Sequence, residues 1–298
     1  MMSIGLGLKD PPMSAVPGLA LAAEQAGLSH LFSTELSVVQ DVVTGRDPFL
    51  IAASALAATS RLSLGTGVVG TPFHAPMHLA LSAATLNEQF PGRFVLGLGV
   101  AHRAFADHIG WPYPSSPMTH IREHLGDLAR IRGRLSFGEG FPVWLAALGD
   151  RMIETAAAHA DGVMLNWVGP QGVERAVATA DRPELEVAIL LRVGRRAGLL
   201  EGATRYAEMF PNYRRHFERQ GLHDPATVIA RTCLDIEDLA GSGELLAEFA
   251  EAGVDRLILY PADADLSLIH GVIEQAAQWT GPDDHTDVRP KEGRRTDA

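Results

Sequence analysis

Strand-like and helix-like segments alternate along almost the whole chain, and this alternation constrains the fold more than any single motif. Short runs rich in apolar and β-branched residues are separated by Ala-, Leu- and Glu-rich stretches with helical spacing. Runs such as FVLGLGV are apolar at nearly every position, which is typical of parallel strands covered by helices. The eight strand-like runs are residues 3–8, 29–35, 61–69, 93–100, 142–148, 161–168, 186–193 and 255–260.

Eight strands, each followed by a helix, predict a single (β/α)8 TIM barrel of the α/β class, with a doubly wound open sheet as the alternative. A barrel of about 250 residues would use most of the 298 residues. The segment 195–252 is longer than one barrel helix requires, so we expect extra helices between strands seven and eight. We predict a barrel domain over 1–280 and a disordered polar tail over 281–298, which lacks apolar periodicity.

Charge and composition exclude several functional classes. The net charge of −11 disfavours a nucleic-acid partner, because proteins that bind nucleic acid usually carry a basic face. The single cysteine, Cys233, cannot form an internal disulfide. Neither a signal-peptide pattern nor an apolar run of about 18 residues is found. We expect a cytoplasmic enzyme with a small-molecule substrate and no membrane partner, and a homodimer is left open.

The stretch RLSLGTGVVGTPFHAPMHLA carries glycines at the spacing G-x-G-x-x-G, which suggests a dinucleotide-binding turn. Such a turn needs a helix directly after its third glycine and an acidic residue at the end of the next strand. Here Pro72 and Pro76 delay the helix until about residue 76, because residues before proline avoid the helical region. The acidic residue at the required distance, Glu88, lies at a helix end. The dinucleotide interpretation therefore fails.

Glycines also mark the ends of two neighbouring strands of the predicted barrel. Gly67 and Gly70 end the third strand, and Gly97 and Gly99 end the fourth. The C-terminal ends of barrel strands carry the active site. Glycines there either relieve crowding inside the barrel or let a flat ligand lie against the backbone. Two adjacent strand ends of this kind favour a planar cofactor.

Three segments together resemble the luciferase-like monooxygenase superfamily, and specifically its coenzyme F420-dependent oxidoreductases. They are LGTGVVGTPFHAPMHLA, LNEQFPGRFVLGLGVAHRAF and VWLAALGDRMIETAAAHADGVMLNWV. The segment MFPNYRRHFERQGL also resembles an actinobacterial subgroup of that family. The resemblance covers strands one to seven. It implies an α/β barrel that binds F420 or FMN at the strand C-termini and transfers a hydride.

The resemblance also implies which positions bind the cofactor. In F420-dependent members a non-prolyl cis peptide lies in a bulge at the end of strand three and backs the deazaflavin ring, and alignment places it at Gly67-Val68. His74, on the loop after the third strand, contacts the cofactor or substrate or packs within that loop. Free amides at a helix N-terminus favour an anion, which supports a phosphate site after strand five. The remaining matches are Gly99, Val100 and Ala101 for backbone contacts, Leu148 and Gly149 for the phosphate, and Asn166 for a side-chain contact.

The sequence departs from the family pattern at its acid-base residues. Several F420-dependent dehydrogenases have a histidine at the end of strand two and a tryptophan four residues later, where this chain has Glu35 and Val39. Where those enzymes have a glutamate after strand four, this chain has His102. A histidine and a carboxylate are thus present at exchanged positions. Glu35 and His102 are the candidate catalytic residues for proton transfer.

Two further patterns are weaker. His120, Glu123 and His124 stand in the order of an inverted zinc-protease helix, but no convincing third ligand accompanies them, so we expect no metal. The basic run from Arg192 to Arg196 follows strand seven on the catalytic side. It either meets the anionic tail or phosphate of F420 or forms a solvated patch.

The leading prediction is an oxidoreductase that transfers a hydride between F420 and a small organic substrate. An FMN-dependent monooxygenase on the same fold is the second hypothesis. The third is a barrel that binds a flavin or deazaflavin without catalysis, since the acid-base residues of the family are displaced.

Overall fold

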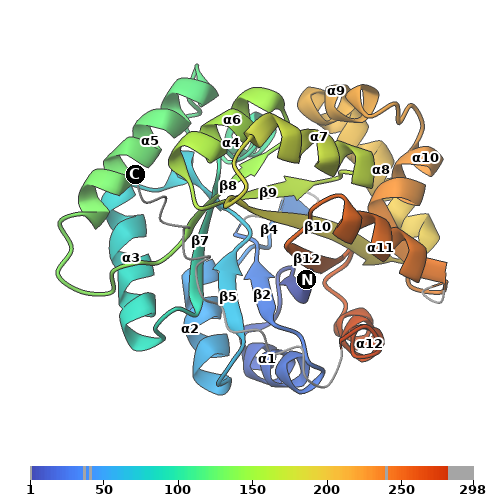
Figure 1. Ribbon diagram of the computed structural model, residues 1–298, viewed down its shortest axis with the longest axis horizontal. Coiled ribbons are helices and arrows are strands. Elements are labelled where there is room, and N and C mark those ends of the chain that lie inside the picture. The colour runs from blue at the N-terminus through green and yellow to red at the C-terminus, as the bar shows by residue number, and fades with distance from the viewer. Residues whose placement is uncertain (1, 36–37, 40–41, 239–240, 281–298) are drawn as a thin grey trace, which may run out of the picture.

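A closed barrel of parallel strands forms the centre of the computed structural model, which describes residues 2–35, 38–39, 42–238 and 241–280 (Figure 1). The first strand pairs with the last, and β9 pairs with β10, so the ring has no free edge. This confirms the TIM-barrel prediction and excludes the open sheet. The barrel strands are β1 (Ser3–Leu8), β2 (His30–Ser33), β5 (Ser63–Thr66), β7 (Phe94–Gly99), β8 (Val143–Ala147), β9 (Gly162–Asn166), β10 (Glu186–Gly194) and β12 (Arg256–Pro261).

Helices surround the barrel in Figure 1 and follow its strands in the chain. Several begin with proline, whose fixed φ and missing N–H suit the first helical turn. Gly27 and Gly253 adopt positive φ just after helix ends, as their sequence context predicted. The helices outside the inserted segment are α1 (Val16–Gln25), α2 (Pro48–Ala58), α3 (Pro76–Gln89), α5 (Pro117–Arg132), α6 (Asp150–His159), α7 (Pro170–Ala180) and α12 (Leu266–Ala276).

The long segment between β10 and β12 folds into extra helices, as predicted. They are α8 (Arg196–Met209), α9 (Pro211–Arg219), α10 (Pro225–Thr232) and α11 (Ser242–Glu251). A short strand, β11 (Cys233–Asp235), pairs in parallel with the C-terminal end of β10. Trp167 and residues of α8, α9 and α10 form a hydrophobic core separate from that of the barrel. The helices α8, α9 and α10 lie together at one side of the barrel (Figure 1).

The loops contain short elements that the sequence pattern did not predict, because two to six residues show no periodicity. They are η1 (Met13–Ala15), the hairpin strands β3 (Val38–Val39) and β4 (Val42–Val43), η2 (Thr71–Phe73) and α4 (Arg103–His108). The predicted polar tail, 281–298, lies outside the described residues, and the division into domains stays a prediction. No helix in the described ranges is long and apolar enough to cross a membrane.

The third barrel strand, predicted over 61–69, is interrupted at the position where the resemblance implies a bulge, beside the cis peptide bond Gly67-Val68. The strand stops at Thr66 and resumes as β6 (Val69–Gly70). Gly65 is in register with Val95, whereas Val69 is in register with Leu98, so the third strand carries one extra residue: a bulge. The Thr66 hydroxyl spans the gap, since it donates to Gly97 O at 2.7 Å and accepts from Gly97 N at 2.8 Å.

Large side chains fill the barrel interior, and glycines on adjacent strands make room for them. Phe32 and Trp144 stack inside the barrel with ring centroids 5.4 Å apart. A Cβ at Gly65 would lie 2.3 Å from the ring of Phe32, and one at Gly97 would lie 1.9 Å from Thr66 O. Gly65 and Gly97 are therefore required by packing, which is the crowding explanation for these two positions.

Candidate active site

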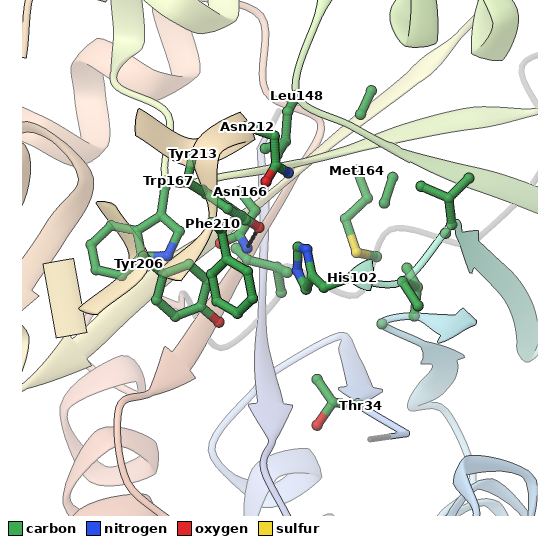
Figure 2. A pocket seen from close by; sticks show the side chains of 18 of the residues that line it. Thr34, His102, Leu148, Met164, Asn166, Trp167, Tyr206, Phe210, Asn212 and Tyr213 are labelled. Carbon is green, nitrogen blue, oxygen red and sulfur yellow. Dashed lines mark hydrogen bonds between the residues drawn. The ribbon is translucent and has the colours of Figure 1, made fainter. Parts of the chain in front are cut away.

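A cavity of about 930 Å³ opens at the C-terminal ends of the barrel strands, between those ends and the helices α8 and α9. Figure 2 shows Tyr206, Phe210 and Tyr213 on one side of it, with His102 facing Phe210. A volume of this size accommodates a drug-sized ligand. The cavity also lies where barrel enzymes place their active sites.

One wall of the cavity is formed by small residues of the bulge after β5 and of the end of β7. Gly67, Val68 and Gly99 line it, and the peptide bond between Gly67 and Val68 is cis, where the resemblance placed it. Ala101 follows with a backbone φ of 54°, in the left-handed region that residues other than glycine rarely adopt. Residues held in such conformations cluster at functional sites. This wall presents little side chain and fits a flat ring.

Glu35 holds the loop after β6 in place. Its Oε2 accepts a hydrogen bond from Gly70 N at 2.8 Å, and its Oε1 contacts His74 Nε2. Burial by itself would lower the pKa of His74, but the hydrogen bond and negative charge of Glu35, with the charge of Asp47, raise that pKa. Glu35 lines the cavity, whereas His74 lies behind it and is not among the lining residues. The pair thus presents a carboxylate to the cavity with a protonatable imidazole behind it.

His102 lies across the cavity mouth in an apolar setting. Its ring stacks on Phe210 with centroids 4.4 Å apart and lies 5.5 Å from the rings of Phe105 and Tyr213. Burial lowers the pKa of His102 to about 4. The imidazole is therefore neutral at pH 7, so that it can accept a proton or donate one N–H hydrogen bond. Glu35 pairs with His74. No hydrogen bond joins Glu35 and His102 in the described part of the chain.

Side chains of α9 attach this helix to the ends of β8 and β9. The His216 imidazole lies between Leu148 O, at 3.0 Å, and Trp167 O, at 2.8 Å. Arg219 donates to Leu148 O at 2.7 Å, and Gln220 donates to Trp167 O at 3.0 Å. These contacts explain the polar residues of MFPNYRRHFERQGL: they fix the helices that cover the cavity.

The N-terminus of α6 faces the cavity beside this attachment. Gly149 is its N-cap and carries no side-chain cap, so the amides of the first turn are available to a ligand. Arg219 packs so closely that a Cβ at Gly149 would lie 3.2 Å from its Nη1. Arg151 and Arg215 line the same cavity. Free amides and guanidinium groups gather here, an arrangement that favours an anion, although the carboxylate of Asp150 lies in the same first turn.

Asn166 connects β9 to the covering helices and to β10. Its Nδ2 donates to Tyr213 Oη at 2.9 Å, which Figure 2 shows as a dashed line, and its Oδ1 accepts from Arg192 at 3.0 Å. Trp167 follows with a left-handed φ of 53°. Asn166 lines the cavity with its amide already held in one orientation.

The His120 and His124 pair does not form a metal site. His120 Nε2 bonds the hydroxyl of Thr71 at 3.1 Å, and burial lowers the pKa of His124 to about 4. Across the described ranges, no group of three or more His, Cys, Asp or Glu side chains could hold a metal ion.

The structure brings most of the predicted site residues to one cavity. Apart from His74, every predicted residue lines it: Glu35, Gly67, Val68, Gly99, Val100, Ala101, His102, Leu148, Gly149 and Asn166. The sequence analysis missed Lys9 and the aromatic residues of α8 and α9, because their contribution depends on how that insertion folds back over the barrel. It singled out Arg192 only as part of a basic run.

Comparison with known proteins identifies the family. The family model described as luciferase-like monooxygenase matches residues 3–193. A 5,10-methylenetetrahydromethanopterin reductase of Methanolobus tindarius is 28% identical over 183 residues, which are 56% of this chain and 54% of that protein. A putative coenzyme F420-dependent oxidoreductase of Mycobacterium tuberculosis is 30% identical over 142 residues, or 45% of this chain and 38% of that one. The chain thus matches about half the length of these relatives or less.

Solved structures share the fold. An F420-dependent secondary alcohol dehydrogenase in complex with an F420-acetone adduct superimposes with a TM-score of 0.70 at 16% identity, covering 92% of this chain and 98% of that one. The FMN-bound oxygenating constituent of 3,6-diketocamphane monooxygenase from Pseudomonas putida gives 0.68 at 14%, covering 95% and 99%. The barrel, its bulged third strand and the family match agree. The chain belongs to the luciferase-like monooxygenase family.

Proposed function

We propose that this protein is an oxidoreductase that transfers a hydride between coenzyme F420 and a small organic substrate. The observation that carries the proposal is the pairing, in one cavity, of a flat backbone wall with an anion site at the N-terminus of α6. A planar ring with a phosphate-bearing chain fits that arrangement. The choice of F420 rests on the sequence resemblance to F420-dependent oxidoreductases and on the relative from Mycobacterium tuberculosis.

The residues present fit the cofactor. Gly67, Val68 and Gly99 would lie against the ring, because no long side chain fills that wall. Gly149, the first-turn amides of α6 and Arg219 would hold the phosphate. When bound, the cofactor supplies or accepts the hydride, while the protein contributes orientation and electrostatics.

The proton that accompanies a hydride is assigned to Glu35. Its carboxyl group lines the cavity, and the imidazole behind it, whose pKa is raised, can hold a proton and return it. His74 acts through Glu35 and is a positioning residue in this scheme. His102, neutral and stacked on Phe210, orients the substrate and excludes water from the mouth.

Titration of the purified protein with F420 and with FMN tests the cofactor. Binding of F420 without FMN supports the proposal, and the reverse supports an FMN-dependent monooxygenase. Oxidation of reduced F420 is then followed with a panel of small carbonyl and unsaturated substrates. Cofactor binding without turnover across that panel favours a non-catalytic barrel, and failure of both cofactors to bind below the millimolar range rejects all three hypotheses.

A further inference from the structure

Arg192, at the C-terminal end of β10, is a buried cation that borders the cavity. Only 8% of the residue is exposed. Its guanidinium carbon lies 4.3 Å from the ring centroid of Trp167, 5.0 Å from that of Tyr206 and 5.3 Å from that of Tyr260. Its polar contacts are hydrogen bonds to Asn166 Oδ1 at 3.0 Å and Tyr206 Oη at 3.1 Å. These partners are an indole, two phenols and an amide, and none of them is a carboxylate.

The contrast with Arg256 shows what Arg192 lacks. Arg256 is equally buried, at 7% exposed, and is neutralised by Glu186 at 3.1 Å near the N-terminal end of the barrel. Within the described ranges, no carboxylate forms an ion pair with Arg192. Burial of a charge is costly unless it is paired, and a guanidinium has five N–H donors, of which two are used here. A ligand that brings negative charge would supply the missing partner.

A second cation borders the same part of the cavity. Lys9 follows β1 and donates from Nζ to Ala262 O at 2.8 Å, just after β12. The strands β10, β12 and β1 are neighbours in the barrel, so Lys9 and Arg192 flank Tyr260. Asp10 and Asp263 act electrostatically on Lys9, whose pKa is lowered by burial. Arg192, by contrast, bonds an amide and a phenol and has no ion pair among the described residues.

This cationic region lies across the barrel from the wall proposed for the cofactor. That wall belongs to the bulge after β5 and to the end of β7, whereas Arg192 lies in the last part of β10 and Lys9 directly follows β1. The rings of Tyr206, Phe210 and Tyr260 surround the space between them. This part of the cavity combines aromatic rings with the cations Arg192 and Lys9, and the carboxylate of Asp263 also lines it.

We propose that Arg192, assisted by Lys9, binds an oxyanion on the substrate, so that the substrate is a small apolar molecule that carries a carboxylate or a phosphate ester. A planar guanidinium held by Asn166 and Tyr206 matches the two oxygens of such a group. The aromatic rings take the apolar part. The inference rests on the proposed function only for the placement of the cofactor on the opposite wall.

Binding of three probes by calorimetry tests the assignment, with F420-loaded and cofactor-free protein at constant ionic strength. Benzoate and phenyl phosphate carry the two oxyanions, and benzamide is the neutral counterpart. We expect at least one anion to bind tenfold or more tightly than benzamide, and the preferred anion identifies the group. Equal binding of benzamide and both anions overturns the proposal.

Variants locate the site. Arg192→Met should abolish the preference for the anion and leave F420 affinity unchanged, whereas Arg122→Met, an exposed position on α5 outside the cavity, should change neither. A preserved preference in Arg192→Met, or an equal loss of F420 affinity, overturns the assignment. If Arg192→Met does not fold, Arg192→Lys takes its place, because lysine keeps the positive charge but lacks the two parallel N–H donors of the guanidinium. Arg192→Lys should weaken anion binding at least threefold. Unchanged anion binding in this variant overturns the assignment.

The two proposals fail independently in this design. If the protein prefers the anion but does not bind F420, the proposed function is overturned and the proposed anion site is still supported. A protein that binds F420 and shows no preference between benzoate, phenyl phosphate and benzamide overturns the anion site alone.

Discussion

The carboxylate of Glu35 and the imidazole of His74 are in direct contact at the mouth of the barrel, 39 residues apart in the chain. One oxygen of the same carboxylate accepts the N–H of Gly70. The second and third strand ends are thereby joined beside the cavity. The contact places an imidazole whose pKa is raised directly behind a carboxylate that lines the cavity.

Glu35→Gln should reduce turnover with F420 and substrate by about 100- to 10,000-fold, the usual contribution of a general acid or base. The amide keeps its hydrogen-bonding shape, so F420 affinity should change little. Steady-state kinetics and a binding titration measure the two effects. The control is Glu123→Gln, on the exposed face of α5. Full activity in Glu35→Gln would remove the carboxyl group from the mechanism.

His74 should stabilise the fold more at low pH than at high pH. Its folded-state pKa is raised above the ordinary 6.5, so its contribution is fully present below about pH 6.5 and is lost as pH rises through the folded value. Urea unfolding of the wild type and His74→Gln at pH 6 and pH 9 gives the difference in free energy of unfolding. That difference should shrink at pH 9, and an identical difference at both pH values would contradict the pairing.

His102 should titrate far below an ordinary histidine. Burial lowers its pKa to about 4, so the folded protein takes up this proton only near pH 4, whereas the unfolded chain takes it up near the ordinary 6.5. The protein therefore loses stability as pH falls from 6.5 towards 4. Carbon-13 NMR of histidine-labelled protein, assigned with His102→Phe, measures the midpoint. A midpoint near 6.5 would show that the ring is solvated and not stacked on Phe210.

Substitution by alanine should have different effects at Gly67 and at Gly97, which lie on neighbouring strands. Gly97→Ala places a Cβ 1.9 Å from Thr66 O and should lower the free energy of unfolding by about 1–3 kcal/mol, because the obstacle is backbone. At Gly67 the nearest atom is Phe32 Cβ at 3.1 Å, so Gly67→Ala should fold nearly as well but bind F420 more weakly. Gly126→Ala, on the open surface of α5, is the control. Equal destabilisation of the two barrel variants would contradict this account.

Under the proposed placement of the cofactor phosphate at the N-terminus of α6, Arg219→Met should weaken binding of both F420 and FMN by about tenfold, because a charge-assisted hydrogen bond to the phosphate is lost. Calorimetry at two salt concentrations measures the affinity and its salt dependence, which should decrease in the variant. Arg130→Met, an exposed position on α5, should behave as the wild type. Unchanged affinity for both cofactors would place their phosphates elsewhere.

Local sequence patterns predicted the barrel because strand and helix periodicities are properties of neighbouring residues. Apolar runs, prolines at helix starts and glycines at helix ends each act within a few positions, and the family resemblance placed the cis peptide at Gly67-Val68. The resemblance also implied the bulge at this position, and the register of the third strand with β7 confirms it by one extra residue.

The alternation of strands and helices, and the glycines at two strand ends, determined by themselves the fold and the end of the barrel that bears the site. Tertiary structure decided which charges meet there. Closure of the barrel pairs Glu35 with His74 and leaves His102 neutral among aromatic rings. The folding of 195–252 over the mouth buries Arg192 without a carboxylate in the described structure. Such pairings depend on contacts between distant segments, for which no local periodicity exists.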